Sequence, residues 1–125
     1  MADKTFLDWP FFDDRHRALA AEVDDWAGAS LAHVDHADAD AACRALVRAM
    51  GDAGILTHSA VDPSGGALDV RSLCLIRETL ARHDGLADFA FAMQGLGTGA
   101  ISLFGTDEQK ADWLPLTRAG RAISA

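Results

Sequence analysis

The chain has 125 residues, of which 50% are hydrophobic and 24% charged, and its formal net charge is −8 at pH 7. This length fits one domain, and the globular composition, rich in alanine and without tyrosine, favours helix. The eleven lysines and arginines are scattered along the chain, so no basic surface for nucleic acid is expected.

The start of the chain and its cysteine count indicate a cytoplasmic protein. Met1 is followed by Ala-Asp-Lys rather than by a basic segment and an apolar run, so no signal peptide is expected. Two cysteines are too few for a disulfide framework, which fits a reducing compartment. The longest uncharged stretch, Phe89 to Phe104, is short for a membrane span and contains polar residues and glycines, so we expect a buried helix and no membrane partner.

Two amphipathic helices are expected in the first half of the chain. Acidic residues at the start and an i, i+4, i+7 apolar repeat predict a helix from about Asp14 to Ala27, ended by Gly28. After a polar loop, a second helix with an apolar stripe ends just before Gly54. The stripe contains Cys43, Leu46, Val47 and Met50. Because Cys43 belongs to this core-facing stripe, we expect a small, buried and unreactive thiol.

The second half begins with a surface loop at residues 62–66, which contains a proline and two glycines. Asp69 is expected to cap a third helix, which Gly85 ends. The fourth helix, from about Leu86 to Phe104, has no charge after Asp88 and is apolar nearly all round. Such a helix needs neighbours on several sides, so we expect it to be the most buried of the bundle.

The fifth helix starts at a capping box, in which the Gln109 side chain reaches back to the backbone amide of Thr106. Pro115 lacks an amide hydrogen, so we expect it to open a further turn or to kink the helix before Gly120. Residues Ala122 to Ala125 then begin an apolar strand. The predicted fold class is therefore all-α, an up-and-down bundle of about five helices.

The segment GLGTGA, Gly95 to Ala100, fits the glycine pattern of dinucleotide-binding turns. A strand should then enter Gly95, and an acidic residue that binds ribose should follow about 20 residues on. The segment is followed instead by a fresh helix cap, so NAD binding is the lowest-ranked hypothesis. The favoured alternative is that Gly95 and Gly99, four apart on one helical face, let another helix or a ligand approach the backbone closely.

No cluster of residues predicts a catalytic or metal site. His33 to Asp40 places two imidazoles among carboxylates, but no second group of ligands completes a metal site, so we expect a solvated acidic loop. His16, His58 and His83 are isolated in the sequence, and polar-face positions are expected for them. We therefore predict no catalytic residue and no metal in this chain.

Three segments of the chain share a family pattern. They are GALD after the loop at 62–66, LARHDGLADFAFAMQ and, above all, FGTDEQKADWLPLTRAGRAISA. Together they resemble the N-terminal helical domain of the acyl-CoA dehydrogenase family, from about Phe11 to Ala125. The matching residues of the last segment are Gly105, Thr106, Glu108, Gln109, Lys110, Leu114, Pro115, Leu116 and Gly120.

The resemblance implies that residues 1–125 are the N-terminal domain of an FAD-dependent acyl-CoA dehydrogenase, inactive alone. The middle β-domain, which holds the flavin, and the C-terminal helical domain, which carries a glutamate base, would be absent from this chain. The implied partners are these missing domains, acyl-CoA in the complete enzyme and further copies in a homo-oligomer. Related acyl-CoA oxidases, nitroalkane oxidases and flavin monooxygenases use the same fold and stay open as alternatives.

Carried over by position, the fourth helix would form one wall and the end of an acyl-chain pocket. The substrate-binding residues that the resemblance implies are Phe89, Ala92, Met93 and Leu96. The small residues Ala92 and Gly95 would make the acyl-chain pocket deeper, whereas the Phe89 ring would make it shallower. The alternative is that these are plain core side chains at helical spacing. No cofactor-binding residue is assigned.

A rival hypothesis from a different class is a free-standing helical interaction or oligomerisation module that keeps the fold without catalysis. Such a module would have a self-sufficient core and would bind no flavin. The dehydrogenase hypothesis predicts instead that an isolated domain exposes apolar surface and self-associates, because its helices are meant to face other domains.

Overall fold

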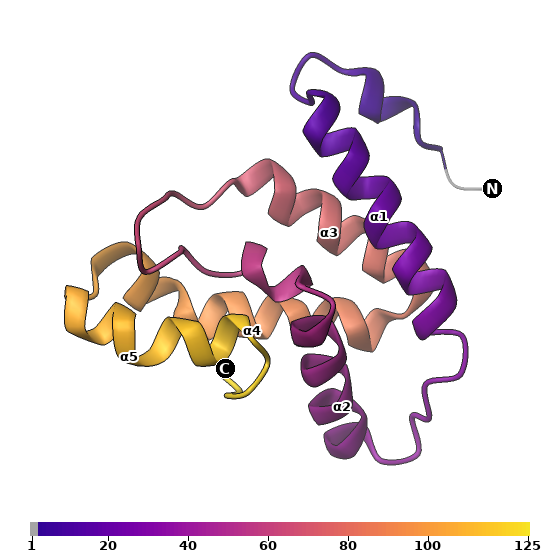
Figure 1. Ribbon diagram of the computed structural model, residues 1–125. Coiled ribbons are helices and arrows are strands. Elements are labelled where there is room, and N and C mark those ends of the chain that lie inside the picture. Colours follow the sequence, from indigo (N-terminus) through magenta and orange to yellow (C-terminus); the bar gives the residue numbers. More distant parts are fainter. Residues whose placement is uncertain (1–2) are drawn as a thin grey trace.

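The computed structural model describes residues 3–125, which form a bundle of α-helices joined by tight turns and by two longer loops, at 31–38 and 59–69 (Figure 1). The helices are α1 (Asp14–Ser30), α2 (Ala39–Asp52), α3 (Val70–His83), α4 (Gly85–Phe104) and α5 (Asp107–Arg118), with the short 3-10 helices η1 (Thr5–Asp8) and η2 (Ile55–His58). No strand occurs between residues 3 and 125. The all-α fold class is therefore confirmed.

Helix α1 begins where its acidic residues predict but runs further than expected. The Asp13 side chain accepts hydrogen bonds from the backbone amides of Arg15 and His16, which satisfies two donors of the first turn. The predicted end at Ala27 is wrong, because the helix continues through Gly28 to Ser30. A Cβ built on Gly28 would lie 3.8 Å from the His83 ring, so packing of α1 against α3 outweighs the low helix propensity of glycine there.

A single residue, Asp84, separates α3 from α4. Its backbone amide donates to the Leu80 carbonyl at 2.8 Å, and its carboxylate accepts from the amides of Leu86 and Ala87 at 2.8 and 2.9 Å. Asp84 is extended, with φ −155° and ψ 117°, and it is therefore the end of α3 and the cap of α4 at once. The expectation that Gly85 ends α3 is wrong, since Gly85 is the first residue of α4.

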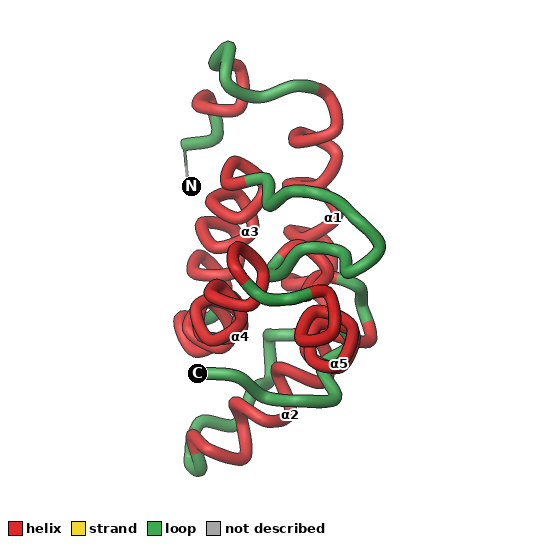
Figure 2. The backbone as a smooth tube through the Cα atoms, turned by 90° about the vertical axis from the view of Figure 1, so that its left-hand side faces the viewer, coloured by secondary structure: helices red, strands yellow, loops and turns green. Residues whose placement is uncertain are grey.

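Helix α5 has the predicted capping box, with Thr106 and Gln109 exchanging hydrogen bonds of 2.9 and 3.2 Å. The helix continues through Pro115 to Arg118. Two residues after its end, Gly120 has a φ of +68°, which favours glycine, and the Arg121 amide then donates to the Leu116 carbonyl at 2.8 Å. The expected strand at 122–125 is wrong: this segment is an irregular stretch that passes beside α4 (Figure 2).

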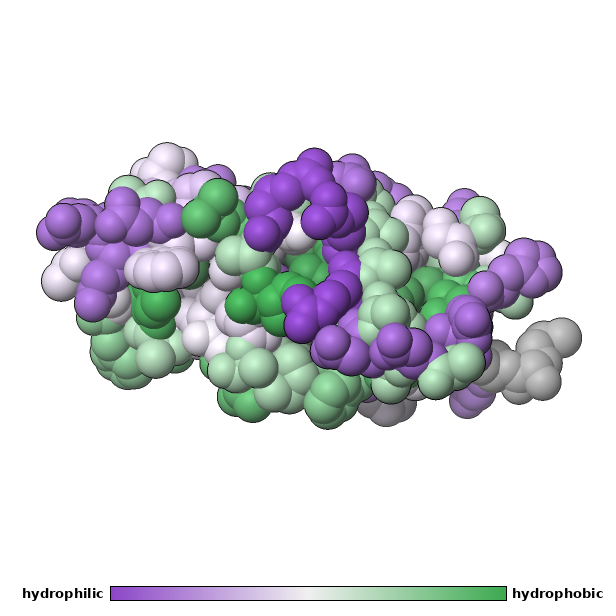
Figure 3. Space-filling model, turned by 90° about the horizontal axis from the view of Figure 1, so that it is seen from below, coloured by the Kyte–Doolittle hydropathy of each residue, from purple (hydrophilic) through white to green (hydrophobic). Residues whose placement is uncertain are grey.

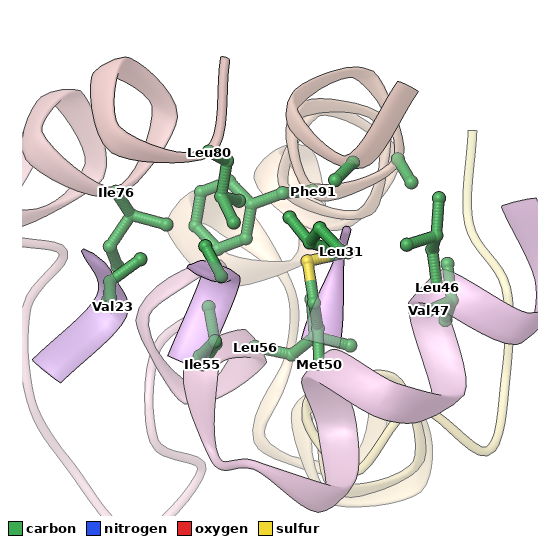
Figure 4. Packing of buried hydrophobic residues seen from close by; sticks show 13 residues of the cluster. Val23, Leu31, Leu46, Val47, Met50, Ile55, Leu56, Ile76, Leu80 and Phe91 are labelled. Carbon is green, nitrogen blue, oxygen red and sulfur yellow. The ribbon is translucent and has the colours of Figure 1, made fainter. Parts of the chain in front are cut away.

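The hydrophobic core joins α1, α2, η2, α3 and α4. Its buried members are Val23, Ala27, Leu31, Leu46, Val47, Met50, Ile55, Leu56, Ile76, Leu80, Ala87, Ala90 and Phe91. Figure 4 shows Phe91 of α4 lying among Ile76 and Leu80 of α3 and facing Met50 of α2. Because side chains from four α-helices meet there, the core fixes the position of α4 relative to the rest of the bundle.

Helix α4 has neighbours on several sides, as expected, since it packs against α2, α3 and α5 (Figure 2). A smaller share of its residues is exposed than in any other α-helix, which agrees with its expected place as the most buried helix, but one line of apolar side chains is uncovered. Phe89, Leu96 and Leu103 lie on α4 with 55, 71 and 60% of their surface exposed. One face of α4 is thus apolar and uncovered by the described part of the chain.

Candidate functional site

One face of α4 presents exposed apolar side chains. Phe89, Leu96 and Leu103 follow one another at intervals of seven residues, which is about two turns of helix, so they form one line along α4. We call these three residues the outer stripe. Contiguous exposed apolar surface of this kind marks sites of contact with another protein surface or with an apolar ligand.

A groove of about 360 Å³ borders the outer stripe at Phe89. Its lining comes from α2, α4 and the segment 122–125 and consists of Asp40, Cys43, Arg44, Val47, Phe89, Ala90, Met93, Gln94, Ile123, Ser124 and Ala125. Figure 3 views the molecule from below and shows apolar side chains on that face with strongly hydrophilic ones among them. The groove combines an apolar wall with the Arg44–Asp40 ion pair, whose Nε and Oδ2 atoms lie 3.2 Å apart.

The four substrate-facing residues expected from the sequence lie on one face of α4, at i, i+3, i+4 and i+7. Phe89 and Met93 line the groove, whereas Ala92 and Leu96 lie outside its lining. Ala92 and Met93 are half-buried, and Phe89 and Leu96 are exposed. None of the four belongs to the buried core, so the alternative that they are plain core side chains is not supported in this chain.

Cys43 does not occupy the core position that its sequence pattern suggests. It is half-buried and lines the groove, while the neighbouring Ala42 is the buried residue of that turn. The buried residues of α2 are Ala42, Leu46, Val47 and Met50, so the core-facing stripe starts one residue earlier than predicted. Cys43 still lies on the same side of α2 as Met50, which is seven residues or about two turns further on, so it is the position of Cys43 near the start of the helix, beside the groove, that leaves the thiol outside the core. Cys74, on α3, is exposed.

Gln94 is a functional candidate that the sequence reasoning missed. Its side chain is fully buried, and all of its polar partners lie after residue 116. The amide nitrogen donates to the carbonyls of Thr117 and Ala122, and the amide oxygen accepts from the Ser124 amide at 2.8 Å. A signal was available in the sequence, because a lone amide within an apolar helix must find hydrogen-bond partners if it is buried.

The glycines of GLGTGA lie in the interior of α4, so no strand enters Gly95 and the dinucleotide hypothesis fails in its predicted context. The close approach expected at Gly95 is confirmed, since a Cβ there would lie 3.3 Å from the Ser59 carbonyl oxygen. The same expectation for Gly99 is wrong, because a Cβ there would meet no atom of the described chain within 4 Å. Of the three glycines in this segment, Gly97 makes the tightest approach, with a Cβ position only 2.5 Å from the Ala125 nitrogen.

His16 was expected on a polar face but is fully buried between the first turns of α1 and α3. The Asp13 backbone amide donates to its Nδ1 atom, so the ring proton resides on Nε2, which lies 2.8 Å from Asp69 Oδ2. Burial raises the pKa of Asp69, but hydrogen bonds from His16, Ser72 and Arg71 outweigh it and hold that pKa well below its usual value. His16 therefore joins two helix caps and lines no groove described here.

The other histidines have mostly structural partners. His83 lies 2.7 Å from Asp24, and the hydrogen bond from His83, followed by that from Lys4, lowers the pKa of Asp24 to about 2. His58 is half-buried, and burial together with the Arg118 charge lowers its pKa. The acidic loop from His33 to Asp40 is largely exposed, as expected, with Val34 half-buried within it. Within residues 3–125 no three His, Cys, Asp or Glu side chains gather as metal ligands.

Comparison with known proteins agrees with the geometry, which defines an all-helical domain with an uncovered apolar helix face. The sequence profile described as "Acyl-CoA dehydrogenase, N-terminal domain" matches residues 13–121. The chain is also 31% identical over 119 residues to a protein of Bacillus subtilis (strain 168) named "Probable acyl-CoA dehydrogenase". The chain belongs to the acyl-CoA dehydrogenase family and corresponds to its N-terminal domain.

The match to the Bacillus subtilis protein covers 91% of this chain but 20% of that relative. The residues compared here are therefore about a fifth of the relative's length. In addition, none of the helices between residues 3 and 125 combines the length and apolar character needed to cross a bilayer.

Proposed function

We propose that this chain is the N-terminal domain of an FAD-dependent acyl-CoA dehydrogenase, an enzyme that introduces an α,β double bond into an acyl-CoA thioester. The observation that carries the proposal is the family profile match over residues 13–121. The outer stripe of α4 supports it, because a domain that packs against others within one enzyme must leave apolar surface uncovered when it stands alone.

In this proposal residues 1–125 form one domain, and the chemistry resides in domains outside them. A bound flavin would accept the β-hydride after a carboxylate base removes the α-proton. The described residues do not themselves fit FAD: the only glycine-rich stretch resembling a nucleotide turn lies within α4, where its backbone amides belong to the helix. No cofactor-binding residue is therefore assigned in this chain.

The part of the chain that we propose to contact substrate is the face of α4 with Phe89, Ala92, Met93 and Leu96. These side chains are apolar and not committed to the core, so they are free to contact an alkyl tail. Each methylene removed from water in such a contact contributes about 0.8 kcal/mol. Covering this face would also exclude water from the neighbouring reaction centre. Acyl-CoA binding, assembly into a homo-oligomer and a cytoplasmic location are parts of the same proposal.

The second candidate is a free-standing helical interaction module. The observation in its favour is the continuous buried core of thirteen residues, which is built without help from outside the described chain (Figure 4). In this alternative the outer stripe would contact a partner protein rather than other domains of an enzyme. The two candidate functions differ in one respect: the dehydrogenase binds flavin and acts on acyl-CoA, whereas the interaction module does neither.

The experiment that separates them uses the polypeptide purified from its natural gene, with whatever sequence accompanies residues 1–125. Its flavin absorbance is recorded, and reduction of an electron-accepting dye is measured with acyl-CoA thioesters of graded chain length. The dehydrogenase proposal predicts bound flavin and acyl-CoA-dependent dye reduction. A protein that carries no flavin and reduces the dye with none of the thioesters would contradict the proposal and favour the interaction module.

A further inference from the structure

The segment after α5 is attached to α4 through one buried side chain. Gln94 Nε2 donates to the Ala122 carbonyl at 3.1 Å, while Gln94 Oε1 accepts from the Ser124 amide at 2.8 Å. The Ser124 hydroxyl also donates to the Gln94 carbonyl at 2.9 Å. Because opposite ends of one amide bind residues two apart, a shift of the segment by one residue would break both bonds.

A second, independent feature of α4 fixes the same segment. The backbone at Ser124 and Ala125 passes so close to Gly97 that a Cβ there would lie 2.7 Å from Ser124 Cβ and 2.5 Å from the Ala125 nitrogen. No ordinary Cβ contact is that short, so only glycine permits this path. Gln94 and Gly97 are three residues apart and therefore neighbours on one face of the helix.

The position of this segment determines the shape of the groove beside the outer stripe. Ile123, Ser124 and Ala125 form part of the groove lining, together with residues of α2 and with Phe89 and Met93 of α4. The segment makes no strand pairing, so its hold on α4 depends on the contacts at Gln94 and Gly97. If the segment moved away from α4, the groove would open on that side.

We propose that Gln94 and Gly97 are positioning residues that seat residues 122–125 against α4 and thereby set the width of the groove that receives the acyl chain. The use of the groove rests on the proposed function, whereas the seating of the segment does not. Gln94 acts through the backbone of the segment and not on substrate. A buried amide is well suited to this task, because its donor and acceptor ends fit only one register of the segment. An apolar side chain in its place would leave three hydrogen-bonding groups, the carbonyls of Thr117 and Ala122 and the amide of Ser124, without this partner.

The seating is tested with a matched pair of variants in the 125-residue chain, Gly97→Ala and Gly99→Ala. Both place the same methyl group in the same helix, but only the one at residue 97 meets the segment. The readout is hydrogen exchange of the Ser124 amide, followed by NMR. We expect exchange at least tenfold faster in Gly97→Ala and unchanged or slower exchange in Gly99→Ala. Equal exchange in the two variants would overturn the seating.

Gln94→Met provides a second route, since methionine keeps the length of the side chain and removes its hydrogen bonds. Urea unfolding of each variant shows whether the bundle is still folded, and Ser124 exchange is compared only under folded conditions. The expected result is exchange at least tenfold faster than in the unsubstituted chain. Exchange within twofold of the unsubstituted chain would overturn the role of Gln94, even if Gly97→Ala behaved as expected.

The link to the groove is tested in the complete natural polypeptide, by the dependence of kcat/KM on acyl-chain length. Gly97→Ala is expected to shift the preferred chain length, and Gly99→Ala to leave it unchanged. If Gly97→Ala speeds Ser124 amide exchange but leaves the preferred acyl-chain length unchanged, the proposed role of Gly97 in setting the groove is overturned. Loss of the proposed function would look different, because the unsubstituted polypeptide would then show no acyl-CoA-dependent activity, while the exchange result would still decide the seating.

Discussion

The Nε2 atom of His16 lies 2.8 Å from Oδ2 of Asp69, a residue 53 positions further along the chain. Through this contact the first turn of α1 is joined to the cap of α3. Since His16 is fully buried, the hydrogen bond is shielded from water and contributes more than an exposed pair would.

We predict that His16→Ala destabilises the protein by about 2–4 kcal/mol, because it combines a buried cavity with loss of a hydrogen bond to a carboxylate. The matched control is His83→Ala, which removes a more exposed ring from Asp24 and should cost about 1 kcal/mol or less. Urea unfolding of both variants measures the difference. Equal losses of stability would show that burial of His16 does not strengthen its contact.

Acid stability should depend on the Asp24 carboxylate. Its pKa is about 3.8 when unfolded and about 2 in the folded chain, so the unfolded state binds a proton more readily. The contribution of ionised Asp24 to the free energy of unfolding is therefore complete above the pKa of the unfolded chain, and it is lost as pH falls from about 4 towards 2. In Asp24→Asn the fall in unfolding free energy over this pH range, measured by urea unfolding, should be shallower than in the unsubstituted chain.

Both cysteines should react with a thiol reagent in the folded chain, contrary to the buried position expected for Cys43 from the sequence. Cys74 is exposed and Cys43 is half-buried in the groove, so Cys74 should be labelled first. The rates are measured by mass spectrometry in the two single Cys→Ser variants. If Cys43 were labelled only on unfolding, the helix orientation that turns its thiol towards the groove would be wrong.

The outer stripe should cause the isolated chain to self-associate and to bind an apolar dye. Leu96 is its most exposed member, so Leu96→Asp should reduce both effects while changing the unfolding free energy by no more than about 0.5 kcal/mol. Light scattering over a concentration series provides the measurement. A clean monomer with little dye binding, before any substitution, would argue against a domain that is meant to face others.

The sequence predicts local structure well where the signals are themselves local. The caps at Asp13, Asp69 and Thr106 involve partners only two or three residues away, and each is found. The junction at Asp84 was missed because glycine next to a helix end commonly follows the helix, whereas here the aspartate cap of α4 takes precedence. The helix through Gly28 likewise continues because of packing that the local sequence does not contain.

The candidate site depends more strongly on contacts between distant residues. The expected line of residues on α4 follows from helical spacing, but the groove also needs α2 and the segment 122–125. Gln94 binds residues about thirty positions away, and Gly97 is essential only because that segment passes over it. Cys43 has the helical spacing of a core residue, but it lies near the start of α2 and borders the groove, which an apolar pattern on one helix does not reveal.

The acyl-chain-length profile of Phe89→Ala in the complete natural polypeptide, with Trp113→Ala on α5 as control, tests whether α4 lines the acyl pocket of a dehydrogenase. Both residues are exposed aromatics, but only Phe89 lines the groove. We predict dye reduction with acyl-CoA thioesters and a shift of kcat/KM towards longer chains in Phe89→Ala alone. An unchanged profile would remove Phe89 from the pocket wall, and a polypeptide inactive with every acyl-CoA would contradict the assignment as a dehydrogenase domain.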